Sequence, residues 1–493
     1  MTLKTNVLIY GAGSSGLVTK QTLENEMYSS YNIIGFIDDN TSKVGKSLIG
    51  APIYSPKRAL DQDFLLRNGI TEVILSIQKL DSQKKREIID NCLELNLKTK
   101  VIPPVERWIQ GELSSAQIKS VRIEDVLSRE QIKLDSSNIA RELSGKVVLV
   151  TGAAGSIGSE IVRQVLHFGP AKVVLVDQAE SPLYELELDV KTHYLRFFPL
   201  IEVVVADVSD RRRMVSVFER FNPQVVFHAA AYKHVPLMEE HPSEAVRVNV
   251  VGTFNLASLS IEHQVEKFVM VSTDKAVNPT NVMGATKRVA ELIVQSRERS
   301  GKMATQFITT RFGNVLGSNG SVIPVFKKQI DEGGPLTITH RNITRYFMTI
   351  SEACNLVLEA GAMGNGGEIF VFDMGQSVKI IDLAKKMIQL SGLEEGRDIE
   401  IVEIGLRPGE KLYEELLATE ENTKETHHDK IMIANVAPEP SEQVDRGIKK
   451  LMSELQKTGN EKAIVLQIKE LVPEFISNNS PFSQLDPSET ANS

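Results

Sequence analysis

The sequence predicts an α/β protein with two units of the same kind, each a parallel sheet covered by helices. Short apolar runs alternate with helical segments along the chain, which is the pattern typical of parallel sheets. Twice, an apolar run leads directly into a glycine-rich turn and then a helix: Asn6–Tyr10 precedes Gly11–Gly16, and Lys146–Val150 precedes Thr151–Gly158. Glycines at such a turn let the backbone approach a phosphate at the helix N-terminus. Both units are therefore predicted to be Rossmann-like.

The composition excludes several other classes of protein. The chain has 493 residues, 42% of them hydrophobic and 24% charged, so it can bury the cores of roughly three domains. Its net charge of -8 excludes a broad surface for nucleic acid, and its two cysteines fit a reducing compartment. No apolar run approaches the ~18 residues of a membrane span. We therefore expect a cytoplasmic protein without an integral membrane segment, in solution or at the inner membrane face. The nine histidines lack ligand spacing, so no metal site is predicted.

The first unit is predicted over residues 1–105. Its second strand, Ile33–Ile37, ends in Asp38 and Asp39, and an acid at that place could bind a ribose hydroxyl. A lone glycine fingerprint is weak evidence, and no catalytic group accompanies this one. Two interpretations stay open: a scaffold whose glycines serve only the tight turn, and a domain that binds a ligand.

Two further segments flank the second unit. Residues 106–143 are predicted to form a connector that packs through Trp108, the one tryptophan of the chain. The second unit is predicted over residues 144–476, with a substrate lobe built mainly after residue 310. From Ser477 the chain is rich in Ser, Pro, Asn and Asp and has no apolar period, so 477–493 are predicted to be a disordered tail.

The second glycine loop carries the signs of a dinucleotide site. The next strand, Val173–Val176, is closed by Asp177, 19 residues after Gly158, which is the spacing of an acid that binds the adenosine ribose. Gln178 follows, and no arginine stands there to hold a 2′-phosphate, so the sequence favours NAD over NADP. The predicted cofactor-binding residues on the loop and the next strand ends are Gly152, Gly155, Ser156, Ile157, Gly158, Asp177, Asp207, Val208, Ala229 and Ala231.

Reactive side chains follow a later strand of the same sheet. The strand Phe268–Val271 leads into Ser272, Thr273, Asp274 and Lys275, and ligands of such sheets bind beyond the carboxyl ends of the strands. A hydroxyl, a carboxyl and an amine are therefore expected at the mouth of the cofactor crevice. Met283 and Lys287 open the following helix, where they share one face.

These segments resemble the extended short-chain dehydrogenase/reductase superfamily. Within it they are most similar to the CapD-type polysaccharide-biosynthesis branch, the nucleotide-sugar 4,6-dehydratases of bacterial glycan pathways. The first 105 residues look like the extra N-terminal domain of the long members, which usually carry membrane helices ahead of it; we expect this chain to lack them. The matching stretches are Thr151–Glu160, His228–Glu239, Val271–Lys287, Arg311–Pro324 and Arg407–Glu415.

The resemblance implies a dehydration in three steps. NAD takes a hydride from C4 of the sugar, water then leaves across C5 and C6, and the hydride returns to C6. Lys275 is implied as the base at C5, with a pKa lowered by nearby Lys287 and partial burial. Asp274 is implied as the acid at the C6 hydroxyl, which requires a raised pKa. Thr273 would bond the 4-oxygen, and a bound water or Asp274 would accept the 4-hydroxyl proton.

The catalytic helix departs from the wider superfamily, whose helix carries Tyr-x-x-x-Lys. Met283 stands at the tyrosine position, as in the long dehydratases, and a thioether cannot take a proton from a hydroxyl. Lys287 is implied to hold the nicotinamide ribose and to place positive charge near the developing oxyanion. Asn249 is implied to orient the backbone near the cofactor.

The resemblance also implies a diphosphate site, because arginine forks match phosphate geometry and stay charged. Glu410 could accept hydrogen bonds from a uridine ribose. The predicted substrate-binding residues are Lys233, His234, Arg311, Asn314, Arg345, Arg407 and Glu410.

The expected reaction is 4,6-dehydration of UDP-N-acetylglucosamine with retention at C5, for capsule, O-antigen or glycoprotein glycan biosynthesis. We expect a homo-oligomer, since relatives of this fold pair through helices beside the catalytic one. Two alternatives stay open. A UDP-sugar 4-epimerase shares the hydride step, but it has no use for the acid Asp274 at C6. A non-catalytic module that binds NAD or a nucleotide sugar would bind NAD tightly without turning over any UDP-sugar.

Overall fold

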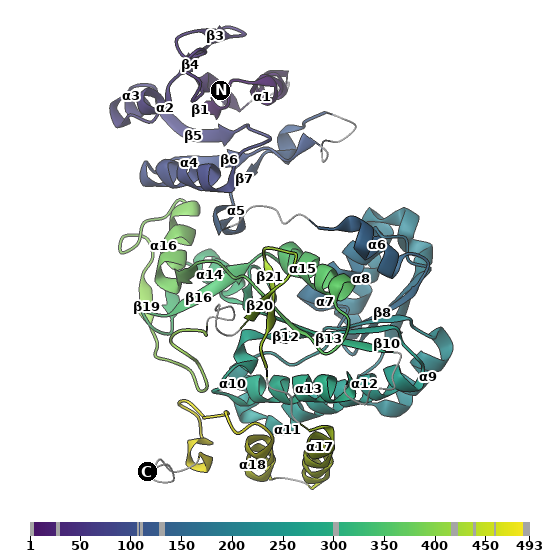
Figure 1. Cartoon of the computed structure of the whole chain (residues 1–493). Coiled ribbons are helices and arrows are strands. Elements are labelled where there is room, and N and C mark those ends of the chain that lie inside the picture. Colours follow the sequence, from purple (N-terminus) through teal and green to yellow (C-terminus); the bar gives the residue numbers. More distant parts are fainter. Residues whose placement is uncertain are drawn as a thin grey trace. The chain divides into compact units, whose positions relative to one another are not determined.

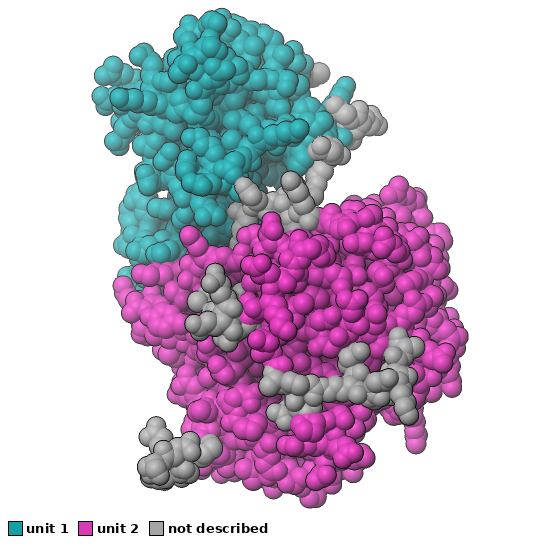
Figure 2. All heavy atoms as spheres, in the orientation of Figure 1, with its two compact units in different colours: residues 1–130, 325–337, 381–402 teal, residues 131–324, 338–380, 403–493 magenta. Residues whose placement is uncertain are grey.

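The computed structural model of the chain describes residues 4–25, 30–105, 108, 112–127, 134–298, 305–415, 423–436, 440–457 and 460–486. It divides into two compact units (Figure 2). Unit 1 comprises residues 1–130, 325–337 and 381–402, and unit 2 comprises 131–324, 338–380 and 403–493. Two segments of the lobe predicted after residue 310 therefore group with unit 1. Among the described residues, no helix is both long and apolar enough to cross a bilayer.

Unit 1 is built on a seven-stranded sheet in the order β3-β4-β2-β1-β5-β6-β7 (Figure 1). The pairs from β4 to β6 are parallel, and the short strands β3 and β7 add antiparallel edges. The central strands are buried on both faces, which explains their continuous apolar runs. The elements are β1 (Thr5–Tyr10), α1 (Ser14–Asn25), β2 (Tyr31–Ile37), β3 (Ser47–Leu48), β4 (Ala51–Tyr54), α2 (Pro56–Ala59), α3 (Gln62–Arg67), β5 (Ile70–Leu75), α4 (Ser82–Glu94), β6 (Lys98–Val101), β7 (Lys119–Ser120) and α5 (Ile123–Leu127).

The segment predicted as a connector, 106–143, belongs in part to each unit. Strand β7 pairs with β6, and Lys85 of α4 lies 3.1 Å from Asp125 of α5, so this half extends unit 1. Helix α6 (Ser136–Leu143) buries Ile139 and Leu143 in the core of unit 2. The predicted connector is therefore divided between the two units, because each half has an apolar face that its own unit covers. Residues 106, 107, 109–111 and 128–133 lie outside the described residues.

Unit 2 is built on a nine-stranded sheet in the order β10-β9-β8-β11-β12-β13-β17-β21-β20. The strands from β10 to β17 are parallel, and the strand order reverses between β8 and β11, which creates the crevice where such sheets bind ligands. The elements that position the site are β8 (Val147–Thr151), α7 (Ser156–Leu166), β9 (Lys172–Asp177), α8 (Glu180–His193), β10 (Ile201–Val205), α9 (Arg211–Phe221), β11 (Val225–His228), α10 (Val235–Glu240), α11 (Pro242–Ala245), α12 (Thr253–Glu262), β12 (Lys267–Thr273), α13 (Val282–Glu298) and β13 (Gln306–Phe312).

The later elements complete unit 2 and supply the two helical segments of unit 1. Strand β17 pairs antiparallel with β21, and β16 lies between β14 and β18 in a small sheet. These elements are β14 (Asn314–Val315), α14 (Val322–Asp331), β15 (Leu336–Ile338), β16 (Thr344–Met348), α15 (Ile350–Met363), β17 (Ile369–Phe372), β18 (Ser377–Lys379), α16 (Ile380–Leu390), β19 (Ile401–Glu403), β20 (Thr423–Glu425), β21 (Ile431–Ala434), α17 (Ser441–Leu455) and α18 (Glu461–Leu471).

The C-terminal part of the chain is packed rather than free. Helices α17 and α18 lie against helix α13, and Phe482 is buried in the same core. Lys469 donates hydrogen bonds to the Phe475 carbonyl at 3.2 Å and to the Ser477 hydroxyl at 2.9 Å, and it pairs with Asp486. The predicted disordered tail is therefore wrong for residues 477–486, where a few buried groups hold a polar segment. Residues 487–493 lie outside the described residues.

Candidate active site

The second glycine loop needs its glycines for close backbone contacts. A Cβ on Gly158, at the start of α7, would lie 2.0 Å from the Gly152 carbonyl oxygen. Gly152 has φ +67°, and a Cβ there would lie 2.6 Å from the Ala230 nitrogen. The Ala154 amide donates to Asp177 Oδ2 at 3.0 Å, which holds the acid against the loop. Strand β8 therefore delivers the loop, and β9 delivers the acid beside it.

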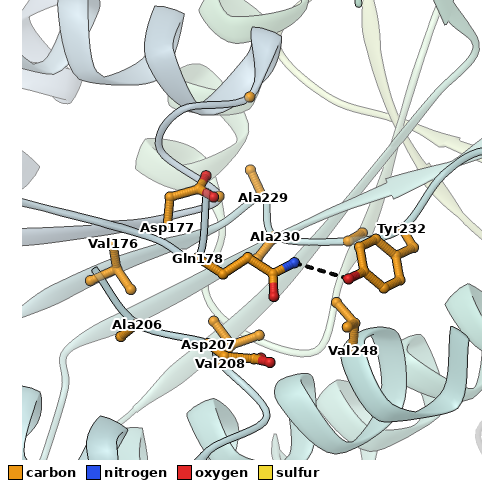
Figure 3. A pocket seen from close by; sticks show the side chains of 13 residues that line it. Val176, Asp177, Gln178, Ala206, Asp207, Val208, Ala229, Ala230, Tyr232 and Val248 are labelled. Carbon is orange, nitrogen blue, oxygen red and sulfur yellow. Dashed lines mark hydrogen bonds between the residues drawn. The ribbon is translucent and has the colours of Figure 1, made fainter. Parts of the chain in front are cut away.

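A groove runs along this loop (Figure 3). Across it, the side chains of Gln178 and Tyr232 point toward one another, and Gln178 Nε2 donates to the Tyr232 hydroxyl at 3.1 Å (Figure 3). The Tyr232 backbone is held by Asn249, whose Oδ1 accepts from the amide at 2.8 Å and whose Nδ2 donates to the carbonyl at 3.0 Å. Asn249 is fully buried and lies outside the groove lining, so it positions the wall. Of the predicted cofactor residues, Gly152, Gly155, Asp177, Asp207, Val208, Ala229 and Ala231 line the groove.

The groove fits the adenosine part of NAD. Its wall includes Val176, Ala206, Val208 and Val248, which offer an apolar surface for a flat base. Asp177 stands where a carboxylate can accept hydrogen bonds from a ribose. Among the described residues that line the groove, none is an arginine that would pair with a 2′-phosphate.

A cavity of about 740 Å³ adjoins the groove. The loop side contributes Ser156, Ile157 and Gly158, and α13 contributes Met283 and Lys287. Four of the five predicted catalytic residues, Thr273, Lys275, Met283 and Lys287, therefore line this cavity, whereas Asp274 is buried and does not line it. The predicted substrate-binding residues that line the cavity are Lys233, His234 and Asn314.

The centre of the site is a buried charge cluster after β12. Asp274 Oδ1 accepts from the Thr273 hydroxyl at 2.8 Å and lies 3.0 Å from Lys275 Nζ. Lys275 Nζ is also 3.3 Å from Glu414 Oε1, and that carboxylate is 3.3 Å from Nε of Arg345. Asp274 Oδ2 is buried without a hydrogen-bond partner in the described structure. A buried carboxyl oxygen in that state favours the neutral acid.

The cluster sets the protonation of its members. Burial raises the pKa of Asp274; the Lys275 ammonium opposes this rise, and the Glu414 carboxylate adds to it. This direction matches the raised pKa expected for the acid. Burial alone would lower the pKa of Lys275, but the carboxylates of Asp274 and Glu414 outweigh burial and raise it. The lowered pKa expected for Lys275 is therefore wrong, because two carboxylates face the amine.

The lowered lysine pKa belongs instead to Lys287 on α13. Burial lowers the pKa of Lys287 to about 8, although Glu291 opposes the change. Its Nζ donates to the Val271 carbonyl at 2.8 Å, which fixes the amine at the end of β12. Met283 lies one helical turn earlier and is buried in the same wall.

Arg311 does not face the cavity. Strand β13 continues to Phe312, so Arg311 lies inside it, between β12 and β17. Its guanidinium forms a two-point ion pair with the fully buried Glu291, at 2.7 Å from Nε and 2.5 Å from Nη2. This arrangement contradicts the diphosphate role predicted for Arg311.

The other two arginines predicted to bind the diphosphate, Arg345 and Arg407, lie in different surroundings. Arg345 is nearly buried, and its fork donates to the carbonyls of Lys411 and Leu412 and to Glu410 at 3.3 Å. Glu410 Oε2 also accepts from the Arg407 amide at 3.2 Å. The side chain of Arg407 is exposed and lies outside the cavity lining. The structure thus joins Arg345 and Glu410 to each other and leaves Arg407 at the surface.

Glu414, the buried partner of Lys275, was not among the residues predicted from the sequence. It follows Tyr413 in a segment with Glu415 beside it, and nothing local distinguishes the two acids. Only the fold does so: the Glu414 side chain is 3% exposed and that of Glu415 is 43% exposed. Within the described residues, no group of three or more potential ligands is placed to hold a metal ion.

Known proteins are similar in sequence to this chain. The family described as "Polysaccharide biosynthesis protein" matches residues 148–436. The "Capsular polysaccharide biosynthesis protein CapD" of Staphylococcus aureus is 44% identical over 458 residues, which cover 92% of this chain and 75% of that protein. A "UDP-N-acetylglucosamine 4,6-dehydratase (inverting)" of Campylobacter jejuni is 35% identical over 282 residues, covering 57% of this chain and 79% of that enzyme.

Two further similarities widen the comparison. A "UDP-glucose 4-epimerase" of Rickettsia rickettsii is 36% identical over 285 residues, covering 57% of this chain and 80% of the epimerase. The solved structure of Pen from Bacillus thuringiensis is 34% identical, with a TM-score of 0.55, and the match covers 63% of this chain and 98% of that one.

Proposed function

The chain belongs to the polysaccharide biosynthesis protein family, and we propose that it is an NAD-dependent nucleotide-sugar 4,6-dehydratase acting on UDP-N-acetylglucosamine. The observation that carries this proposal is the Thr273–Asp274–Lys275 cluster beside the glycine loop. An acid and an amine 3.0 Å apart suit an elimination, which must protonate a leaving hydroxyl and remove a carbon-bound proton.

The residues of the groove and cavity are proposed to hold the cofactor. Asp177 would bind the adenosine ribose, the amides at the start of α7 would bind the diphosphate, and Lys287 would bind the second ribose. When bound, NAD supplies a hydride acceptor at C4 of the sugar and a hydride donor for C6. Met283 offers no proton, so it would serve as an apolar wall of the cavity.

The proton transfers can be assigned to Asp274 and Lys275. The 4-hydroxyl proton passes through the Thr273 hydroxyl to Asp274 Oδ1 as C4 is oxidised, because Thr273 already donates to that oxygen. Neutral Asp274 no longer raises the pKa of Lys275, so the amine gives one proton to solvent and then takes the proton from C5. Asp274 gives its proton to the C6 hydroxyl, which leaves as water. As C6 is reduced, Lys275 delivers to C5 one of its protons, which exchange with solvent. The amine then takes up a proton from solvent, which restores the starting pair of Asp274 carboxylate and Lys275 ammonium. The net change is the loss of one water.

The names of the relatives support this assignment in part. The Campylobacter jejuni relative is a UDP-N-acetylglucosamine 4,6-dehydratase, and its name describes inversion. Retention at C5, expected from Met283, therefore stays a proposal for this chain. The Rickettsia rickettsii epimerase has a similar sequence identity to this chain, 36%, so a 4-epimerase is the second candidate function. The buried acid Asp274 favours dehydration, since epimerisation removes no hydroxyl.

Lys233 and His234 remain proposed contacts for the sugar nucleotide, because both line the cavity. Burial and the nearby Lys275 charge lower the pKa of Lys233. A bound anion would offset both effects. Asn314, whose Oδ1 accepts from Lys275 at 3.3 Å, is proposed to orient that amine. Arg345 and Arg407 stay predictions as diphosphate ligands, and Glu410 stays a prediction as an acceptor of hydrogen bonds from the uridine ribose.

The homo-oligomer, expected to pair through helices beside α13, also stays a proposal. Helix α13 itself packs against α17 and α18 of the same chain. Localisation in the cytoplasm or at the inner membrane face is likewise a prediction from the sequence.

The test is incubation with UDP-N-acetylglucosamine and NAD, followed by mass spectrometry and NMR of the product. We expect a product lighter by one water, with one solvent deuterium at C5 when the reaction runs in deuterium oxide. NMR of that centre distinguishes retention from inversion. An unchanged mass with the galacto sugar would indicate the epimerase, and bound NAD without turnover of any UDP-sugar would indicate the binding module.

A further inference from the structure

We propose that Glu414 is a positioning residue of the elimination: its buried carboxylate holds the Lys275 amine against Asp274 and serves as the permanent counterion of that amine. This inference rests on the proposed function, because it assigns a role within the same acid–base pair. Glu414 lies far from β12 in the sequence, in the loop between β19 and β20. It does not line the cavity itself, but it contacts Lys275, which does.

The Lys275 amine is surrounded by acceptor groups. Its Nζ lies between two carboxylates, 3.0 Å from Asp274 Oδ1 and 3.3 Å from Glu414 Oε1. Both carboxylate side chains are nearly inaccessible, at 2% and 3% exposure, so solvent screens their charges little. A third ligand of the amine, Asn314 Oδ1, is neutral. Lys275 is thus held from three sides, and only one side, Asp274, is required to change its charge during the reaction.

Charge balance supports the same role. Lys275 and Arg345 are two cations, and Glu414 and Glu410 are two anions within ion-pair distance of them. These four charges cancel, so Asp274 is the additional carboxyl of the cluster. Its Oδ2 is buried without a partner in the described structure. The cluster is therefore neutral when Asp274 carries a proton, which is the state that the elimination needs.

Hydrogen bonds from Arg345 and from other segments hold the loop of residues 407–415, which carries Glu414. Arg345 donates to the Lys411 carbonyl at 2.9 Å and to the Leu412 carbonyl at 3.4 Å, which holds the loop beside β16. The Gly409 amide donates to the Asn478 carbonyl oxygen at 2.8 Å, and Asn281 Nδ2 donates to the Gly409 carbonyl oxygen at 3.0 Å. The C-terminal segment and the start of α13 thus fix the loop that delivers Glu414.

Further charged groups facing this cluster are Lys411 and Lys233. Lys411 lies near Glu414 and lowers its pKa together with Lys275 and Arg345, which outweighs burial and keeps Glu414 ionised. Lys233 is close enough to Lys275 for the two charges to oppose each other. Replacing Glu414 by a neutral residue leaves these cations unbalanced, so the pKa values of Lys275 and Asp274 should both fall.

The experiment compares Glu414→Gln with Glu415→Gln and Glu414→Asp. Glu415 is the matched control, because it is the adjacent acid, is more exposed and pairs with Lys411 rather than Lys275. For Glu414→Gln we expect kcat to fall about 10- to 100-fold, KM to change less than about 3-fold, and the whole pH–rate profile to move about one unit toward acid. Glu414→Asp should keep the profile of the natural enzyme while losing part of kcat.

A second readout needs no turnover. Pulsed reductive methylation of the full chain over a pH series, with the Lys275 peptide quantified by mass spectrometry, reports the midpoint at which this amine becomes reactive. Glu414→Gln should move that midpoint about one unit toward acid, and Glu415→Gln should leave it in place. An unmoved midpoint, or a lower kcat with an unmoved pH profile, overturns the positioning role. If the natural protein makes no dehydrated sugar, the proposed function fails, while the methylation midpoint still decides the role of Glu414.

Discussion

The two glycine loops of this chain have nearly the same local geometry. In unit 1, the Ala12 amide donates to Asp38 Oδ2 at 2.9 Å, and in unit 2 the Ala154 amide donates to Asp177 Oδ2 at 3.0 Å. The close glycine contact is repeated as well, since a Cβ on Gly16 would lie 1.9 Å from the carbonyl oxygen of Gly11. The fingerprint therefore specifies a turn and an acid in both units.

The loops differ in what the neighbouring strands bring to them. In unit 1, Asp38 is paired with Lys43 at 3.0 Å, and the residue after β5 is Ser76, whose hydroxyl is bonded to Thr19. In unit 2, the strand end of β12 brings the amine of Lys275 to the cavity, with the buried acid Asp274 3.0 Å from it. The comparison teaches that a glycine fingerprint predicts backbone geometry, while the chemistry depends on strand ends elsewhere in the sheet. The predictions below test that difference.

The largest expected effect is the loss of Lys275. Lys275→Ala should lower kcat for dehydration by roughly 10²- to 10⁴-fold, the range associated with removal of an acid–base group. Lys43→Ala, which removes the cation beside the loop of unit 1, should leave kcat unchanged. Product formation measured by mass spectrometry checks both variants. Equal losses in the two would mean that the loop of unit 1 also serves the reaction.

The acids beside the two loops offer a matched pair. Asp177→Asn should weaken NAD binding about 10- to 100-fold, because a charged hydrogen bond to a ribose contributes about 1.5–3 kcal/mol. Asp38→Asn should leave the affinity unchanged. Calorimetric titration with NAD measures each affinity. A comparable loss in Asp38→Asn would show that unit 1 contributes to NAD binding.

The pH dependence of NAD binding should report Lys287. Its lowered pKa of about 8 means that the ammonium is present below that pH and is lost as the pH rises through it. We expect the affinity to fall about 10-fold above pH 8, since charged hydrogen bonds are stronger than neutral ones. Titrations between pH 6.5 and roughly 9.5 measure the midpoint. The same fall in Lys287→Gln would assign it to another group.

The smallest expected effect concerns the side chains that meet across the NAD groove. Tyr232→Phe removes the hydroxyl that accepts from Gln178 but keeps the ring, so NAD should dissociate about 2- to 10-fold faster. Stopped-flow displacement of NAD measures that rate. A rate equal to that of the natural protein would mean that this hydrogen bond does not retain the cofactor.

Much of the local structure could be predicted, because it depends on neighbours in the chain. The strand–glycine–helix pattern, the acid Asp177 and the cluster after β12 all follow from residue types at short spacing. Arg311 could not be assigned in this way. The sequence around an arginine near a strand end is the same whether the side chain faces a ligand or a buried acid. The buried acid here, Glu291, lies on helix α13 and contacts Arg311 only in the folded chain.

The sequence by itself therefore determined the two Rossmann-like units and the cofactor loop, and it predicted which groups are candidates for the reaction. Only the tertiary structure decided the protonation of Lys275, the partner of Arg311 and the covering of α13 by α17 and α18. The physical reason is the range of the interactions. Periodicity and turn chemistry act between residues a few positions apart, whereas pKa values and burial depend on charges and apolar faces that the fold brings from distant segments, as Glu414 shows at Lys275.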